Sequence, residues 1–348
     1  MVTGAASYWG HQLCRLLLDN TTHCVIGVDR PTAVLPPDDR LDFVTADTRN
    51  PRLADLMQLE QVDTLYYLDQ PTTPGRLVAG LKNLLTGCAQ AGVGHLVWVS
   101  STAVYGPLPS NAAFIGEEQF PYTKESEGIL AELIAAEQLC FSQARQAPAL
   151  RLTVLRPAHI VGATAPSPLS RYLAGAAAPV LLGFDPLLQL LYEQDLLLAL
   201  LHALEAEPIT AVSNQIPPNL HHINIAAEEL LPLTRLLSLT HTLPLPLFHP
   251  LAYWSSGLLR ATPWQPADIL PYGWDFLRYR CVGATERQAA WGFIPQHSSL
   301  AAVSALAAHK QGQASAAALS ELAQDEQRLQ ETVSQRQQAK AKRGVAHE

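Results

Sequence analysis

The chain has 348 residues, of which 48% are hydrophobic and only 16% are charged, and its formal net charge is −8. This composition predicts an ordered globular protein with a large interior, long enough for one large domain or two ordinary ones. The acidic balance excludes a general nucleic-acid binder, because a phosphate backbone must be neutralised by clustered Lys and Arg. No such cluster precedes the last ten residues.

The sequence also argues against a membrane-spanning or secreted protein. Its longest apolar run near the middle, residues 179–204, is interrupted by Asp185, Glu193 and Asp195, so it predicts no spanning helix. No secretory signal opens the chain, and the five cysteines are scattered without metal-ligand spacing. We therefore expect a cytoplasmic protein with buried reduced thiols, and we leave peripheral membrane association open.

The first thirty residues predict a β-α-β unit. Residues 1–20 give the end of a strand, a tight turn and a helix, and residues 23–30 give a second buried strand that ends at Asp29. Gly4 permits the turn, and Gly10 lets the helix pack closely on the sheet. The helix N-terminus then offers free N–H groups and a positive dipole end to a pyrophosphate.

Asp29 at the end of this strand can accept hydrogen bonds from both hydroxyls of an adenosine ribose, and its charge would repel a 2′-phosphate. NAD is therefore the favoured cofactor. Arg30 leaves NADP open, since a neighbouring guanidinium is the group that accommodates such a phosphate.

The opening stretch resembles the extended branch of the short-chain dehydrogenase/reductase superfamily, the NAD-dependent epimerases and dehydratases. That branch begins TGxxGxxG, which Thr3, Gly4 and Gly10 match, with Ser7 in place of the middle glycine. The resemblance implies an α/β fold, a Rossmann-type doubly wound parallel sheet with a smaller C-terminal substrate-covering domain and a helical tail. Because so little of the first strand precedes Val2, we expect the natural start a few residues upstream. By the resemblance, the cofactor-binding residues of this turn are Gly4, Ser7, Tyr8, Trp9 and Gly10.

Two further strands continue the resemblance. The third is expected to end in Asp47, followed by Thr48, and Asp47 would reach the adenine amino group by analogy with the family. The fourth is followed by the segment that lines the cofactor in the family, here Leu68, Asp69 and Gln70.

The fifth strand runs into Ser100 and Ser101, and the segment SSTAVYG is the most specific similarity in the chain. Ser101 stands four residues before Tyr105 and matches the family's serine or threonine that hydrogen-bonds the reacting hydroxyl or carbonyl. It is therefore our catalytic candidate, and Ser100 is assigned to the cofactor site. The structural alternative is that both hydroxyls cap the segment after the strand. Tyr105 is expected to pack rather than to act as an acid.

The superfamily's tyrosine–lysine pair is missing. A tyrosine and a lysine four residues apart share one helix face, so the ammonium can lower the phenol pKa. Tyr122 and Lys124 are only two residues apart, about 200° around a helix, and cannot act together. The family's places fall instead near residues 128–129 and 132–133 of the next helix, where neither group stands. We interpret the segment around Tyr122 as a loop leading into that helix, with Ser126 as its N-cap.

The second half carries weaker signals. Residues 150–162 fit a sixth strand and the loop beside the nicotinamide, with Pro157 in the family's matching position. Nucleotide-sugar enzymes of this branch usually hold the diphosphate with an arginine, whose place Gln189 takes here. A neutral amide cannot replace a bidentate guanidinium, which argues against a nucleoside-diphosphate sugar as substrate. Asp195 suits the N-terminal dipole of the helix that follows.

We expect an NAD-binding domain over residues 1–165, a substrate-covering domain over 166–305, some of whose segments return to the sheet, and a helical or partly disordered tail over 306–348. The apolar, Pro-rich segment at 241–260 predicts a lid over the substrate, the alternative being peripheral contact with membrane lipid. The histidines show no ligand spacing, so no metal site is expected.

The chain resembles an atypical bacterial group of this branch that also lacks the pair, and two classes of function remain open. One is an NAD-dependent oxidoreductase or epimerase-like enzyme for a small or sugar-like hydroxy or keto substrate. The other is a catalytically silent dinucleotide-binding sensor or accessory subunit, because loss of a placed general acid costs about 10²- to 10⁴-fold in rate. The expected partners are a small-molecule substrate or none, no nucleic acid, a membrane or protein contact through 241–260 or the tail, and a second copy of the chain.

Overall fold

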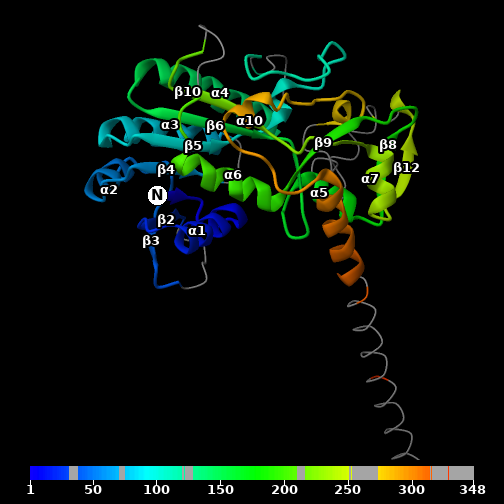
Figure 1. The fold of residues 1–348 in the computed structure, drawn as a ribbon, viewed down its shortest axis with the longest axis horizontal. Helices are drawn as coiled ribbons and strands as arrows, with labels where there is room; N and C mark the ends of the chain where they lie inside the picture. Colours follow the sequence, from blue (N-terminus) through cyan, green and yellow to red (C-terminus); the bar gives the residue numbers. More distant parts are fainter. Residues whose placement is uncertain are drawn as a thin grey trace, which may run out of the picture.

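The centre of the protein is one parallel sheet of seven strands (Figure 1). The computed structural model describes residues 1–30, 38–69, 75–119, 121, 128–209, 216–250, 252, 273–313, 315 and 328. In order across the sheet, the strands are β10 (Leu220–Ile225), β6 (Arg151–Pro157), β5 (His95–Val99), β4 (Thr64–Tyr67), β1 (Val2–Thr3), β2 (Val25–Asp29) and β3 (Leu41–Thr45). The order reverses between β1 and β4, and ligands of such sheets bind at the carboxyl ends beside that point.

Helices cover both faces of this sheet, which confirms the predicted doubly wound α/β fold. Leu-rich faces drive this packing, because both faces of the central strands are apolar. One face carries α2 (Leu53–Leu59), α3 (Arg76–Ala91) and α4 (Gly128–Gln146). The opposite face carries α1 (Tyr8–Asn20) and α6 (Glu193–Glu205). The short α10 (Glu286–Ala290) packs beside β10.

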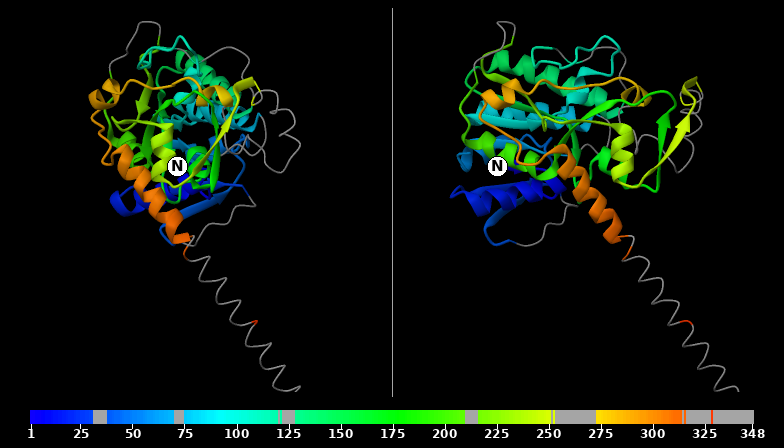
Figure 2. Two further views of the ribbon diagram at one scale, coloured as in Figure 1. Left: turned by 90° about the vertical axis from the view of Figure 1, so that its right-hand side faces the viewer. Right: turned by 45° about the vertical axis from the view of Figure 1, so that its right-hand side comes forward.

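A smaller lobe with its own apolar core continues from β6 and β10 and lies at one end of the molecule (Figures 1 and 2). In its three-stranded sheet β9 is parallel to β7 and antiparallel to β11, and a separate ribbon pairs β8 with β12 in parallel. The lobe's elements are β7 (His159–Val161), α5 (Pro168–Ala174), β8 (Ala177–Leu181), β9 (Leu187–Tyr192), β11 (Leu230–Pro232), α7 (Leu233–Leu239) and β12 (Leu243–Leu247).

Two 3₁₀ turns and a last helix complete the described chain. The turn η1 (Thr102–Tyr105) follows β5, and η2 (Trp274–Leu277) packs on the lobe. A helix over 299–313 leaves the lobe near α5 (Figure 2). Among the described residues, none of the helices is long and apolar enough to cross a membrane.

The structure corrects two predicted strands. The third ends at Thr45, so Asp47 lies in the loop beyond it. Residues 150–162 contain the predicted sixth strand, β6, but after Ala158 the predicted loop is the short strand β7. Pro157 has no N–H to extend the ladder, and Ala158 donates its N–H to the Ile225 carbonyl before the chain turns into the lobe sheet.

Other expectations meet the structure only in part. Four cysteines are buried, but Cys24 is exposed, contrary to the prediction of buried thiols. Within the predicted lid, β12 pairs with β8 and exposes Leu243 and Leu245. Several predicted features lie outside the described residues: Gln70, Tyr122, Lys124, Ser126, residues 253–260 and most of the tail.

Candidate functional site

The turn after β1 has the shape that the glycine pattern predicts. Gly4 has φ +68°, a conformation that side chains disfavour, and its Cα lies against the backbone of residues 68–69. A Cβ on Gly10 would come within 2.0 Å of the Gly4 carbonyl oxygen. Only glycine therefore lets α1 approach the strand this closely.

Ser7 is the N-cap of α1. Its Oγ accepts a hydrogen bond from the Gly10 N–H at 3.1 Å and lies 3.5 Å from the Leu68 carbonyl oxygen. The hydroxyl thus replaces the missing glycine by capping the helix rather than by projecting across the turn. No described residue accepts a hydrogen bond from the amides of Tyr8 and Trp9, which stay available for an anion.

The side chain of Tyr8 crosses from α1 to the lobe. Its hydroxyl lies 2.7 Å from Thr164 Oγ1 and donates to Glu193 Oε2 at 3.0 Å. Glu193, which is buried, also accepts from the Thr164 amide. The backbone of Tyr8 thus belongs to the glycine turn, while its hydroxyl joins α1 to Thr164 and Glu193.

Asp29 ends β2 as predicted and is buried. Its Oδ2 accepts from the Ala6 N–H at 2.9 Å and its Oδ1 from the Arg30 N–H at 2.7 Å. The carboxylate thus fixes the glycine turn against β2 and keeps lone pairs for ribose hydroxyls. The Arg30 guanidinium stands 4.0 Å from the same carboxylate.

A cluster of acids and arginines follows β3 and β4. Asp47 accepts from the guanidiniums of Arg49 and Arg76, and the Arg49 hydrogen bonds hold the pKa of Asp47 well below its usual value. The Thr48 hydroxyl donates to Asp69 at 3.0 Å, and burial raises the pKa of Asp69. Arg76 is buried at the start of α3, where the sequence offered no pattern to single it out.

Ser100 belongs to a buried polar network behind the site. Its hydroxyl donates to Glu137 Oε1 at 2.5 Å, and Glu137 also accepts from Arg156 Nε at 3.0 Å. Arg156 donates in turn to the Tyr105 hydroxyl, which donates to Asn224. Tyr105 is 1% exposed, so its predicted packing role is confirmed.

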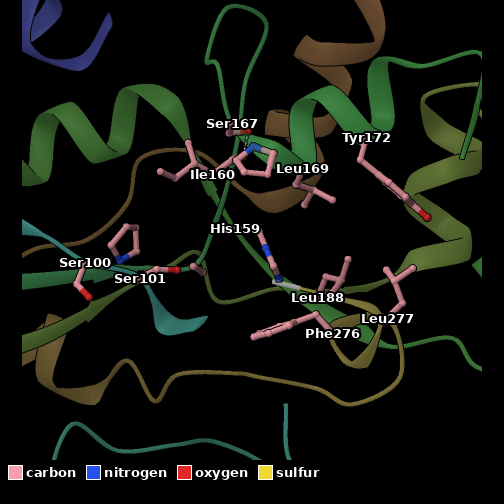
Figure 3. A pocket seen from close by; sticks show the side chains of 14 residues that line it. Ser100, Ser101, His159, Ile160, Ser167, Leu169, Tyr172, Leu188, Phe276 and Leu277 are labelled. Carbon is pink, nitrogen blue, oxygen red and sulfur yellow. Dashed lines mark hydrogen bonds between the residues drawn. The ribbon is translucent and has the colours of Figure 1, made fainter. Parts of the chain in front are cut away.

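Ser101 faces a cavity of about 120 Å³ at the carboxyl ends of β5 and β6 (Figure 3). Its Oγ accepts from the Ala103 N–H at 3.1 Å, so the capping alternative also holds. A hydroxyl that accepts one hydrogen bond still has its own O–H to donate. Pro157 lines the same cavity, and its place beside the nicotinamide stays a prediction.

His159, which no sequence pattern singled out, lines this cavity two residues beyond Pro157 (Figure 3). Burial lowers the pKa of His159 to about 4, so the ring is neutral near pH 7. In the sequence, His159 could be noticed only as a histidine just after the predicted sixth strand. A lone histidine forms no spacing pattern that would mark it as functional.

Helix α4 contains residues 128–129 and 132–133, at which the resemblance predicts the family's tyrosine and lysine. Leu133 is buried in the core, and the Glu132 carboxylate accepts from the N–H groups of Gly75 and Leu77 at the start of α3. At the predicted lysine position, Leu133 thus packs in the core, and Glu132 caps the start of α3.

Gln189 does not face the cavity. Its amide is buried and exchanges two hydrogen bonds of 2.9 Å with the backbone of Gly283. Asp195 lies in the first turn of α6, as predicted, and accepts from the amides of Gln296 and His297. Gln189 thus holds Gly283 against the lobe sheet, and Asp195 holds residues 296–297 against α6.

The comparison with protein families agrees with this geometry. Residues 1–216 match the model of the NAD dependent epimerase/dehydratase family. The chain belongs to this family. Its description, NAD dependent, agrees with the cofactor predicted from Gly4, Gly10 and Asp29.

The chain is also similar in sequence to other proteins and in fold to solved structures. An uncharacterized protein of Mycobacterium tuberculosis is 33% identical over 218 residues, which cover 58% of this chain and 57% of the relative, so the chain spans little more than half of that relative's length. A UDP-glucuronic acid 4-epimerase from Bacillus cereus in complex with NAD is similar with a TM-score of 0.63, at 17% identity over 89% of this chain and 98% of the other. A dTDP-glucose 4,6-dehydratase from Bacillus anthracis in complex with NAD reaches 0.65, at 15% identity over 89% and 96%. At these identities the solved structures show the shared fold alone.

Proposed function

We propose that the protein binds NAD at the turn after β1 and acts as an oxidoreductase or epimerase-like enzyme on a hydroxy or keto substrate. The observation that carries the proposal is the cavity beside Ser101, which opens at the carboxyl ends of the central strands of a dinucleotide-binding sheet. The cofactor would supply hydride acceptance and return at the substrate carbon.

Several groups of this chain fit the dinucleotide. The free amides of Tyr8 and Trp9, at the positive end of α1, suit its pyrophosphate. The buried carboxylate of Asp29 suits the adenosine ribose, and its negative charge favours NAD over NADP. Both features come from the structure itself and agree with the family's description.

Ser101 is the group that would orient the substrate. Its O–H can donate to the carbonyl oxygen of a ketone or to the hydroxyl oxygen of an alcohol, which places the reacting carbon at the cavity wall. The similar solved proteins act on nucleotide sugars by their names. With Gln189 bound to Gly283, the predicted replacement for the phosphate-binding arginine faces away, which supports a substrate without a diphosphate.

Cofactor binding is tested by titrating the purified chain with NAD and NADP and following heat or reduced-nicotinamide fluorescence. We expect NAD to bind more tightly than NADP. Asp29→Asn keeps one oxygen for the Ala6 amide but loses the charge, so it should weaken NAD binding about tenfold or more, some 1.4 kcal/mol, and reduce the discrimination against NADP.

Turnover is tested by adding alcohols and ketones and following absorbance of the reduced nicotinamide. Oxidation or reduction by the intact chain supports the proposal. Failure to bind either dinucleotide contradicts it, and tight NAD binding without turnover across a broad panel would instead support the silent sensor or accessory subunit.

A further inference from the structure

Among the described residues, most of the walls of the Ser101 cavity are apolar. Beside Ser101, the space is lined by the side chains of Ile160, Leu169, Tyr172, Leu188, Phe276 and Leu277 (Figure 3). Apolar cavities of roughly 150 Å³ hold a molecule the size of benzene without water. This cavity of about 120 Å³ is partly open, so its apolar walls suit the hydrocarbon body of a small ligand, part of which extends through the mouth, more than they suit a hydrated sugar.

His159 is placed by the break between β6 and β7. The main sheet ends at Pro157, and His159 begins β7, opposite Leu190 of β9. This turn brings the imidazole into the cavity from the same edge of the sheet as Ser101 (Figure 3). None of the described residues forms a hydrogen bond with its ring, so both ring nitrogens can meet a ligand.

The other polar side chains near the cavity are already engaged. Ser100 donates to Glu137 and points away from the cavity in Figure 3. The Tyr172 hydroxyl donates to the Pro179 carbonyl at 2.7 Å, and burial raises its pKa. Among the described lining residues, His159 is thus the titratable group with capacity left for a proton.

We propose that the cavity binds a small, uncharged, apolar secondary alcohol or its ketone, and that His159 exchanges the proton of the reacting oxygen while Ser101 hydrogen-bonds it. This inference rests on the proposed function, since the hydride must go to a nicotinamide dinucleotide. In this proposal His159, at the break between β6 and β7, takes the proton-exchanging role that a tyrosine has in the family.

The step balances as an oxidation by two electrons. The alcohol C–H bond breaks and its electron pair leaves with hydrogen as hydride to the oxidised dinucleotide. The O–H bond breaks, its electrons form the carbonyl π bond, and the proton goes to a nitrogen of His159. This imidazole is neutral near pH 7, so one ring nitrogen has a lone pair for that proton. Because burial lowers the pKa of His159, the ring holds the proton only briefly and passes it to water. The reverse sequence reduces the ketone.

The ligand class is tested on the full chain without added dinucleotide, so the readout is independent of turnover. Acetophenone carries a methyl group where phenylglyoxylate carries a carboxylate, so the pair tests the effect of charge. UDP-glucose represents the nucleotide sugars. Calorimetric titration should show acetophenone binding at least ten times more tightly than phenylglyoxylate or UDP-glucose. Equal binding, or tighter binding of either anion, overturns the apolar class.

The role of His159 is tested with His159→Gln, which can hydrogen-bond but cannot take up a proton, and with His159→Ala. In NAD-dependent oxidation of 1-phenylethanol, kcat should fall about 10²- to 10⁴-fold in both, with KM changed less than about threefold. Added imidazole should restore part of the rate in His159→Ala. The exposed His23→Gln is the matched control and should behave as the parent chain.

A second readout needs no turnover. The His159 ring nitrogen resonances, identified by their loss in His159→Gln, should shift when 1-phenylethanol binds to the parent chain. Retained acetophenone binding by His159→Gln shows that the variant is folded. Unshifted resonances, or an unchanged kcat in a folded variant, overturn the assignment of His159.

These outcomes separate the inference from the proposed function. A chain that binds no dinucleotide contradicts the proposed function. A chain that binds NAD and oxidises mandelate but not 1-phenylethanol keeps the proposed function and overturns the inference.

Discussion

Ser100 and Ser101 are neighbours in the chain, yet they belong to two regions with opposite character. Ser100 enters a closed network with Glu137, Arg156 and Tyr105, in which each polar group has a buried partner. Ser101 faces an apolar cavity with a free O–H beside His159. Alternate residues of an extended segment point to opposite sides, so one strand end supplies both regions.

The Ser100 network contributes mainly to the stability of the fold, whereas the polar groups of the Ser101 cavity are placed for binding and chemistry. Buried groups that satisfy one another hold β5, β6, β10 and α4 together and have no capacity left for a ligand. Ser101 and His159 at the cavity make fewer buried polar contacts, but they can bind a ligand and exchange protons. The comparison predicts that substitutions in the network change unfolding, whereas substitutions at the cavity change turnover.

Removing the network's acid should have the largest effect. Glu137→Ala leaves the Arg156 guanidinium buried without its carboxylate, and Arg156 is only 1% exposed. Breaking such a buried pair from one side costs about 3–5 kcal/mol. Urea unfolding followed by circular dichroism measures the change.

The double variant Glu137→Met with Arg156→Met is the control. It removes both charges at once, so it should recover much of the lost stability. If it were as unstable as Glu137→Ala, the pair would not be the source of the loss.

A comparison of the two serines comes next. Ser100→Ala removes a hydrogen bond to a charged, buried carboxylate, so it should lower the free energy of unfolding by about 2 kcal/mol. Ser101→Ala removes a cap on η1 and should cost about 1 kcal/mol or less. With substrate and NAD, Ser101→Ala should lower kcat about 10²- to 10³-fold. Equal losses of stability in the two variants would remove the distinction between the regions.

Acid should weaken the network through His222. This ring is buried 3.6 Å from Glu137, whose charge is already neutralised by Arg156, and burial together with the Arg156 charge lowers the pKa of His222 well below 6.5. The unfolded chain binds a proton at this residue below pH 6.5, and the folded chain does not. The free energy of unfolding should therefore fall by roughly 1.4 kcal/mol per pH unit below pH 6.5 because of this residue.

The measurement is a series of urea unfolding curves from pH 7 to 5. His95 and His221 also have lowered pKa values, about 3 and 4, so the parent chain has a steeper total dependence. His222→Gln isolates one contribution. Identical slopes for the parent chain and this variant would show that His222 does not carry the predicted linkage.

The sequence predicted those features that short segments determine. The β-α-β unit follows from Gly4, Gly10 and Asp29, whose roles depend on neighbours within thirty residues. Ser101 was singled out because the segment SSTAVYG at a strand end resembles the family's motif. The parallel sheet follows from the same alternation of apolar strands and helices.

The remaining features depend on contacts distant in the sequence. The break after Pro157 requires β9, some thirty residues later, to take His159 as a partner. Arg76 is recognised only when Asp47 stands beside it. Such pairs leave no local period or spacing, so the proton-exchanging candidate could not be identified from the chain alone.

The smallest predicted effect is the loss of stability on substitution of Glu132, which lies where the resemblance predicts the family's lysine. The Glu132 carboxylate accepts from two amides at the start of α3, so Glu132→Gln loses the charge and one acceptor oxygen there and should cost about 1 kcal/mol. Gln146→Ala, at an exposed position of α4, should change stability by less than about 0.5 kcal/mol. Turnover per folded molecule should be unchanged in Glu132→Gln, because the carboxylate is bound to α3 rather than to the cavity. A loss of turnover without a loss of stability would show that α4 still takes part in the chemistry.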